Sequence, residues 1–106
     1  MIAGTDMVLQ VTDLDAAVAF YERKMELKVV SREAMLVGLD AGTFRLYLEP
    51  GPALGPVLEF FAEDMAAERI RLVEAGCTLI DDDPSVPRCY LRDPYGMVFN
   101  LAQRSK

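Results

Sequence analysis

A short segment rich in proline and glycine divides this chain into two halves. Residues 50–56 read Pro-Gly-Pro-Ala-Leu-Gly-Pro, with three prolines and two glycines among seven residues. Because proline lacks a backbone N–H and clashes inside a helix, such a segment continues neither a helix nor a central strand. We predict a linker at residues 50–56 between a first module at about residues 5–49 and a second at about residues 57–103, within one small domain of residues 1–106.

The first module is predicted to place one helix among four strands. Residues 7–12 alternate apolar and polar side chains, as a half-buried strand does. Asp13 is a typical N-cap, and apolar residues three and four apart predict a helix over residues 14–24. The stripe of this helix consists of Leu14, Ala17, Val18, Tyr21 and Met25. Strands are predicted at residues 27–32, 35–40 and 43–49, with a hairpin-like turn at 40–42.

The second module repeats this order of elements. A strand is predicted at residues 57–62, and a helix at 65–75 begins after Asp64 and ends at Gly76, a usual C-cap residue. Strands follow at residues 78–82, 88–92 and 97–103, and Asp93-Pro-Tyr-Gly96 predicts a tight turn between the last two. The repeat lies in the pattern of elements and not in residue identity. The predicted fold class is therefore α+β.

Two motifs resemble the vicinal-oxygen-chelate superfamily of glyoxalases, extradiol dioxygenases and bleomycin-resistance proteins. The segment Val-Thr-Asp-Leu-Asp-Ala-Ala-Val-Ala-Phe-Tyr at 11–21 is similar to the first-module signature. Arg-Asp-Pro-Tyr-Gly-Met-Val-Phe-Asn-Leu at 92–101 is similar to the closing one, and residues 66–76 resemble the second-module helix. Where the family usually has Leu-Gly after the first helix, this chain has Met25-Glu26, which predicts a different turn in the same fold.

The resemblance implies two βαβββ modules whose curved mixed sheet surrounds a cleft, with the helices on the outer face. Apolar alternation predicts which residues face the helices: Met7, Leu9, Val11, Phe44, Leu46, Leu48, Leu58, Phe60, Met97, Phe99 and Leu101. The opposite parity supplies the predicted ligand-binding residues, which are Asp6, Gln10, Arg45, Tyr47, Glu59, Phe61, Tyr90, Arg92 and Asn100.

Enzymes of this superfamily hold a divalent metal with His, Gln or Glu from the first and last strands of each module. The corresponding residues of this chain are Asp6, Tyr47, Val57 and Asn100. Only Asp6 is a competent anionic ligand, and the chain contains no histidine. We therefore expect no metal ligands, no cofactor and no assigned catalytic residue. A register shift of two residues would bring Glu59 into the ligand set.

Several site residues also have a plain structural interpretation. Tyr47, Phe61 and Tyr90 form either an aromatic slot for a planar ligand or part of the core or a subunit interface. Arg45, Arg88 and Arg92 either meet an anionic group of a ligand or form ion pairs with Glu59, Glu49 or Asp93, and the ion pairs are the favoured interpretation. Cys77 and Cys89 are expected to be buried small apolar residues and not redox-active thiols.

The amino-acid composition limits the kinds of partner that we expect this protein to bind. The net charge of −6 disfavours nucleic acid, and no apolar stretch approaches the length of a membrane span. Two cysteines are too few for a disulfide scaffold, so we expect a cytoplasmic protein. Small size and the habit of the superfamily predict a homodimer.

Three functions follow in order of preference. The first is binding or sequestration of a small molecule, cationic or planar aromatic, without chemistry, as in the bleomycin-resistance branch. The alternative is a metal-dependent lyase, isomerase or dioxygenase with atypical ligands, or a metal-free catalyst with Glu59 or Asp6 as general base. The third is a structural or regulatory module whose cavity is filled.

Overall fold

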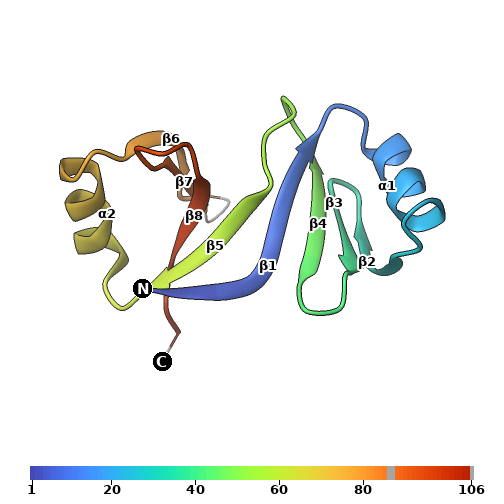
Figure 1. Ribbon diagram of the computed structural model, residues 1–106, viewed down its shortest axis with the longest axis horizontal. Coiled ribbons are helices and arrows are strands. Elements are labelled where there is room, and N and C mark those ends of the chain that lie inside the picture. Colours follow the sequence, from blue (N-terminus) through green and yellow to red (C-terminus); the bar gives the residue numbers. More distant parts are fainter. Residues whose placement is uncertain (86–87, 106) are drawn as a thin grey trace. The chain divides into compact units, whose positions relative to one another are not determined.

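A computed structural model describes residues 1–85 and 88–105 (Figure 1). Within them the order is β1 (Ile2–Val11), α1 (Leu14–Arg23), β2 (Lys28–Glu33), β3 (Leu36–Asp40), β4 (Arg45–Pro50), β5 (Val57–Ala62), α2 (Met65–Glu74), β6 (Thr78–Asp83), β7 (Arg88–Arg92) and β8 (Val98–Gln103). The strands are hydrogen-bonded in the order β2-β3-β4-β1-β5-β8-β7-β6 and form a mixed sheet that is not closed. The predicted α+β class is confirmed. Across the described ranges, neither helix is long and apolar enough to cross a membrane.

The chain forms two compact units. One consists of Thr5–Pro56, and the other combines Met1–Gly4 with the chain from Val57 onward. Strand β1 therefore contributes its first residues to the second unit and the rest to the first.

The Thr5–Pro56 unit has a sheet whose helix-facing side is apolar. Its β1 pairs in parallel with β4, which pairs antiparallel with β3, and β3 pairs antiparallel with β2. Helix α1 lies beside these strands and packs Val18 against the sheet (Figure 1). The buried core residues of this unit are Val18, Val37, Leu39, Leu46 and Leu48, with Met7, Leu9, Val11 and Phe44 partly buried around them. The predicted facing of these residues is confirmed.

The second unit has the same pairing scheme and its own core. Strand β5 pairs in parallel with β8, followed by antiparallel pairs of β8 with β7 and of β7 with β6. Its core contains Ala62, Cys77, Cys89, Leu91, Phe99 and Leu101, against which Leu58, Phe60, Met65 and Leu72 pack. Each half therefore buries alternate strand residues beneath its own helix, as the sequence pattern predicts.

Both predicted N-caps are confirmed. The Asp13 carboxylate accepts a hydrogen bond from the Ala16 N–H at 3.0 Å, and the Asp64 carboxylate accepts one from the Ala67 N–H at 3.2 Å. These bonds satisfy N–H groups that have no partner within the first turn.

The two helices end differently, as the Met25-Glu26 pair predicts. After α2, the Cys77 N–H donates to the Leu72 carbonyl at 2.9 Å, and Gly76 takes a φ of +114°. After α1, the corresponding bond runs from the Leu27 N–H to the Tyr21 carbonyl at 3.1 Å, one residue further along the chain. Glu26 then occupies a left-handed conformation with a φ of +56°.

Met97 does not face the helix within a strand, so that prediction is wrong. Strand β8 begins one residue later, and Met97 is 39% exposed. The backbone N–H of Met97 donates to the Asp93 carboxylate, and its carbonyl accepts the Asp93 N–H, each at 2.9 Å. These bonds tie Met97 to Asp93 directly after the Asp93–Gly96 turn, whose prediction is confirmed.

Strand β1 begins at Ile2, five residues before the predicted start at residue 7. The early residues show no apolar alternation, so the sequence pattern misses them. Their position depends on a tertiary contact, since a Cβ added at Gly4 would lie 2.8 Å from the Phe61 ring.

Candidate functional site

One face of the Thr5–Pro56 unit carries four of the predicted ligand-binding residues. Asp6 and Gln10 lie on β1, and Arg45 and Tyr47 lie on the neighbouring β4. The register places Asp6 opposite Arg45, and Tyr47 opposite Val8 on the same face. Because this parity is opposite to that of the apolar core, these side chains leave the sheet on the side away from α1.

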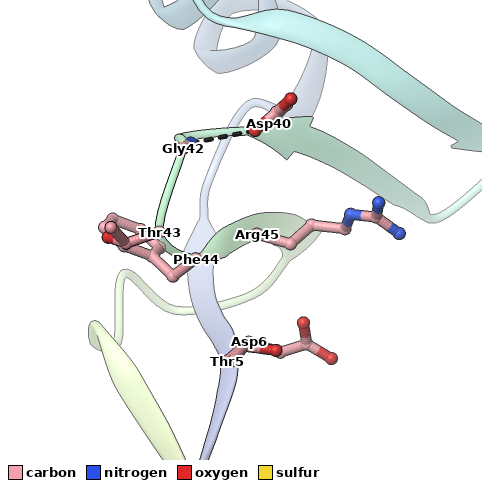
Figure 2. Close-up of a pocket in the computed structure, with 7 residues that line it drawn as sticks. All are labelled: Thr5, Asp6, Asp40, Gly42, Thr43, Phe44 and Arg45. Carbon is pink, nitrogen blue, oxygen red and sulfur yellow. Dashed lines mark hydrogen bonds between the residues drawn. The ribbon is translucent and has the colours of Figure 1, made fainter.

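A depression of about 520 Å³ opens at one end of this face. Its lining residues come from β1, the end of β3 and the turn into β4, and they are Thr5, Asp6, Asp40, Gly42, Thr43, Phe44 and Arg45. Figure 2 shows the Arg45 and Asp6 side chains projecting in the same direction from neighbouring strands. The Asp40 carboxylate accepts the Gly42 N–H at 2.9 Å, which fixes the turn at the rim.

Charges of both signs meet at this depression. The pKa of Arg45 is raised above its usual value, first by the hydrogen bond and charge of Tyr47 and then by Asp6 and Asp40. Arg45 therefore stays cationic at all physiological pH values. In the part of the chain that the structure describes, neither carboxylate comes within 4.0 Å of the guanidinium, so no direct ion pair occupies these three groups.

Tyr47 owes its position to a glycine on the next strand. A Cβ added at Gly38 would lie 3.0 Å from the Tyr47 ring and 2.5 Å from the Ser31 hydroxyl. The ring of Tyr47 therefore lies close over the β3 backbone, half-buried beside Arg45. Aromatic surface of this kind suits a planar ligand group.

The side chain of Gln10 is covered by the linker and does not lie on an open surface. It is buried, and its amide Nε2 donates to the Glu49 carboxylate at 3.1 Å. A Cβ added at Gly51 would lie 2.5 Å from the Gln10 amide oxygen, so the linker covers this side chain. The Gln10 N–H also donates to the Leu54 carbonyl at 2.8 Å, which ties β1 to the linker.

The second unit carries the other five predicted site residues on β5, β7 and β8. Asn100 lies at the centre, opposite Glu59 on one side and Tyr90 on the other. Its amide oxygen accepts the Cys89 N–H at 2.8 Å, and its amide nitrogen donates to the Glu59 carboxylate at 3.2 Å. The amide therefore ties β5 and β7 to β8 and holds Glu59 in place.

The aromatic residues Tyr90 and Phe61 on this face contact other residues of the same unit. Tyr90 is buried, with the Arg88 guanidinium 5.3 Å from its ring centre. Phe61 lies against the backbone of Gly4. These contacts favour the core interpretation for Tyr90 over an open slot.

Two arginines of this unit, Arg88 and Arg92, differ in their contacts and in their exposure. Arg88 pairs with Asp81 at 3.2 Å, an acid that the sequence did not single out as its partner. The β-bulge between Leu79 and Asp81 brings Asp81 opposite Tyr90 on this face, and a regular ladder would not do so. Arg92 is exposed at the other end of β7, opposite Thr78 and Val98.

The four residues at the superfamily's metal positions do not fit a divalent ion. Val57 is buried and has no donor atom, and the Asn100 oxygen is already bonded to a backbone N–H. Tyr47 lies beside the permanent cation Arg45, which repels a metal ion. Among residues 1–85 and 88–105, no group of three His, Cys, Asp or Glu is placed to bind one ion.

The two cysteines lie in the core of the second unit. Cys77 and Cys89 are both free and buried. Burial, followed by the nearby Asp82 charge, raises the pKa of the Cys89 thiol, which lowers its thiolate fraction and its reactivity.

Sequence reasoning missed Asp40 and Ser31 as neighbours of the candidate site. Asp40 lies opposite Arg45 in the β3–β4 hairpin, and Ser31 lies opposite Gly38 in β2. The hairpin turn at 40–42 fixes the Asp40–Arg45 pair, so counting outward from that turn would have found Asp40. Ser31 follows a β-bulge after Val29, which shifts its face and hides it from a simple alternation.

Comparisons with known proteins agree with this geometry. Residues 6–102 match the family model of a glyoxalase-like domain. A glyoxalase/bleomycin resistance protein/dioxygenase superfamily member from Vibrio splendidus 12B01 is 16% identical, with a TM-score of 0.66 over 96% of this chain and 99% of that chain. None of the curated proteins matches this sequence.

Two further solved structures share the fold. A variant of methylmalonyl-CoA epimerase from Streptomyces coelicolor, in complex with 2-nitronate-propionyl-CoA, is 19% identical, with a TM-score of 0.64 over 100% of this chain and 99% of that chain. An NAD-dependent benzaldehyde dehydrogenase from Legionella pneumophila is 12% identical, with a TM-score of 0.69 over 94% and 98% of the two chains. At these identities the structures establish the fold alone. Because the family model spans nearly the whole sequence, this chain belongs to the glyoxalase-like family of the vicinal-oxygen-chelate superfamily.

Proposed function

We propose that this protein binds a small organic molecule without a metal ion, in the manner of a sequestering protein and not of an enzyme. The observation that carries the proposal is the state of the metal positions. Val57 is apolar and buried, and the Asn100 amide is engaged by Cys89 and Glu59. A catalytic divalent metal needs about three protein ligands and an open position.

The depression in the Thr5–Pro56 unit supports a ligand with a cationic group and a planar part. Asp6 and Asp40 offer carboxylates that are not ion-paired to Arg45, and the Tyr47 ring lies beside the guanidinium. Arg45 would donate hydrogen bonds to a carbonyl or anionic group of the same molecule. The net charge of −6 favours the approach of cations. We propose that the same site sequesters drug-like compounds of this kind, and we propose a cytoplasmic setting because Cys77 and Cys89 are free thiols.

Calorimetric titration with planar aromatic cations and their neutral analogues tests this proposal. The variants Asp6→Asn and Arg45→Met should each weaken binding by about tenfold, or about 1.4 kcal/mol. Asp15→Asn and Arg23→Met are matched controls, because both residues lie on α1 and are exposed. Equal losses in the control variants, or no binding by any compound at millimolar concentration, would contradict the proposal.

A second candidate is a metal-free enzyme with Glu59 as general base. It is favoured by the 3.2 Å hydrogen bond from Asn100, which holds the Glu59 carboxylate in one orientation. Glu59→Gln would keep this hydrogen bond and remove the base, so it should abolish turnover and leave ligand affinity within about twofold.

The metal-dependent lyase, isomerase or dioxygenase alternative is tested separately by elemental analysis of untagged protein. We expect no stoichiometric divalent metal after purification and none after incubation with zinc, manganese or nickel. One equivalent of metal that is lost in Asp6→Asn or Glu59→Gln would favour the metal-dependent enzyme over both metal-free functions.

A further inference from the structure

The second unit has a pocket between α2 and its own sheet. The volume of this pocket is about 470 Å³, within the range of about 300–1,000 Å³ that small-molecule sites span. Met65 and Arg69 line it from α2, Asp82 and Pro84 line it at the end of β6, and Leu101 lines it from β8. Apolar side chains therefore surround one acid and one base, a combination typical of a ligand site.

The first unit fills the corresponding space with a valine. The two helices begin directly after equivalent N-caps, Asp13 and Asp64, so their fifth residues, Val18 and Arg69, occupy equivalent positions. Val18 is 4% exposed and belongs to the core of the first unit. Arg69 is half-buried and does not belong to the core of the second. The pocket therefore lies where the other unit has an apolar contact between helix and sheet.

Arg69 lies on the side of α2 that faces the sheet. Met65 and Leu72, four residues before it and three after it, pack against the core, and residues at this spacing share one face of a helix. Arg69 pairs across the pocket with Asp82 at 2.6 Å. Asp82 is in register with the buried Cys89, so it also lies on the helix-facing side of the sheet. An ion pair thus takes the place of an apolar contact.

This ion pair leaves hydrogen-bonding atoms unused. The contact joins Nη1 of Arg69 to Oδ2 of Asp82, whereas a guanidinium carries five N–H donors. Within residues 1–85 and 88–105, neither side chain makes another ion pair or hydrogen bond. The two side chains are 42% and 27% exposed, so a molecule that enters the pocket can reach both. Donors of Arg69 and the second oxygen of Asp82 are therefore available to it.

The charges of the pocket favour an uncharged polar group. A ligand with a single charge of either sign would attract one member of the pair and repel the other. A primary carboxamide offers a carbonyl acceptor for Arg69 beside an N–H donor for Asp82, and it leaves the ion pair intact. The apolar body of the same molecule would lie against Met65, Pro84 and Leu101.

We propose that this pocket binds an uncharged molecule with an apolar body and a terminal carboxamide, which Arg69 and Asp82 recognise together. The pocket lies in a different unit from the depression bordered by Asp6 and Arg45. The inference is therefore independent of the proposed function, and either can fail without the other.

Titration of the isotope-labelled full chain, followed by NMR, tests the site. The probes are hydrocinnamamide, hydrocinnamate and phenylpropylamine, which share an apolar body and differ in charge, and propionamide, which lacks the ring. Hydrocinnamamide should bind with a Kd below about 1 mM and shift resonances of α2 and the end of β8, and the other three should bind at least about tenfold more weakly. No saturation at about 10 mM, equal affinity for the amide and both charged probes, or shifts confined to Thr5–Pro56 would overturn the proposal.

Two variants separate the roles of the base and the acid. Arg69→Val introduces the residue type of Val18 and removes the donors, so it should weaken amide binding by at least about tenfold. Asp82→Asn leaves Arg69 as an unpaired cation, so the preference should change from hydrocinnamamide to hydrocinnamate. Arg71→Val is the matched control, because Arg71 lies on the same helix, pairs with Glu68 and does not line the pocket. It should bind the amide as wild type does, within about twofold.

The spectra of the free variants show whether each chain is folded. Amide affinity that is unchanged in folded Arg69→Val, or a preference for the amide that persists in folded Asp82→Asn, would contradict recognition by this pair. A loss of amide affinity in Arg71→Val as large as that in Arg69→Val would contradict it as well.

Discussion

At the scale of single residues, Asn100 uses both ends of its side-chain amide for hydrogen bonds within the protein. Its amide accepts the Cys89 N–H beyond the last paired residues of the β7–β8 ladder and donates to Glu59 across β5. Both polar ends of the side chain are satisfied, and the part of the chain that the structure describes contains no buried side-chain N or O without a partner. The side chain of Asn100 therefore ties β5, β7 and β8 together.

Replacing Asn100 by Leu should destabilise the protein by about 2 kcal/mol. The buried Cys89 N–H would lose its acceptor, and the Glu59 carboxylate would lose a donor. Urea denaturation measures the effect. Glu59→Gln is the control, because it keeps both bonds of Asn100 and should cost less than about 1 kcal/mol. Equal stabilities of Asn100→Leu and wild type would show that the hydrogen bonds contribute nothing.

Cys89 should make the protein less stable at high pH. Burial raises the thiol pKa in the folded state above its ordinary value of 9.0, so the unfolded chain loses this proton first. The contribution is complete below pH 9.0 and is lost as the pH rises through the folded pKa. Urea denaturation between pH 7 and 10 should show a steeper loss for wild type than for Cys89→Ala. Parallel pH profiles of the two proteins would be inconsistent with a raised pKa of the Cys89 thiol.

At the scale of elements, the two modules use different residues for the turn that follows each helix. Each must turn from its helix into the following strand with a residue of positive φ. The second module uses Gly76, and the first uses Glu26, whose Cβ crowds the backbone in this conformation. The strain is local, and the helices and strands around it are alike in the two modules.

Glu26→Gly should stabilise the protein by about 0.5–1 kcal/mol. Glycine adopts a positive φ without a steric cost, and the Glu26 side chain is exposed. Gly76→Ala is the opposite change and should destabilise by about 1 kcal/mol or more, since its Cβ would also lie 3.2 Å from Pro94. Thermal unfolding of both variants gives the comparison. A loss of stability in Glu26→Gly would mean that φ is not the controlling factor there.

Gly38→Ala should reduce stability by about 1–3 kcal/mol and displace the Tyr47 ring. The added Cβ meets the Ser31 hydroxyl at 2.5 Å and the ring at 3.0 Å. The double variant Gly38→Ala with Ser31→Ala removes the nearer clash and should recover part of the loss. Tyrosine fluorescence and urea denaturation report the two effects. Full stability of the single variant would show that strand β3 accommodates the methyl group.

At the scale of the whole molecule, each unit has its own apolar core and its own polar face. The depression bordered by Asp6, Asp40 and Arg45 lies entirely within the Thr5–Pro56 unit. The Asn100 hydrogen bonds lie entirely within the other unit. The chain has 17 acidic and 11 basic residues, which gives it a net charge of −6.

Binding of a cationic ligand should therefore weaken as salt is added. Raising ionic strength from about 0.01 M to about 0.15 M shortens the screening length from about 30 Å to about 8 Å. Affinity for a planar cation should fall several-fold over this range, and affinity for its neutral analogue should stay constant. Calorimetric titration at both ionic strengths provides the measurement. Equal salt dependence of the two ligands would exclude an electrostatic contribution.

The sequence by itself determined the order of elements and, apart from the β-bulges after Val29 and Leu79, the face on which the strand residues lie. Alternation with a period of two, Asp N-caps and a proline-rich linker act through local geometry, so they are readable without a structure. The observed ends of the helices and strands differ from the predicted ends by only one or two residues. The exception is the start of β1, where Gly4 lies against Phe61.

Only the tertiary structure decided what the polar face does. Parity placed Asn100, Tyr90 and Gln10 on that face, but it could not show that Asn100 is bonded, or that Tyr90 and Gln10 are buried. Those outcomes depend on contacts between residues far apart in the chain, such as Asn100 with Glu59 and Gln10 with Gly51. Local periodicity is set by neighbouring backbone geometry and carries no record of such contacts, because they arise only when the strands pack together.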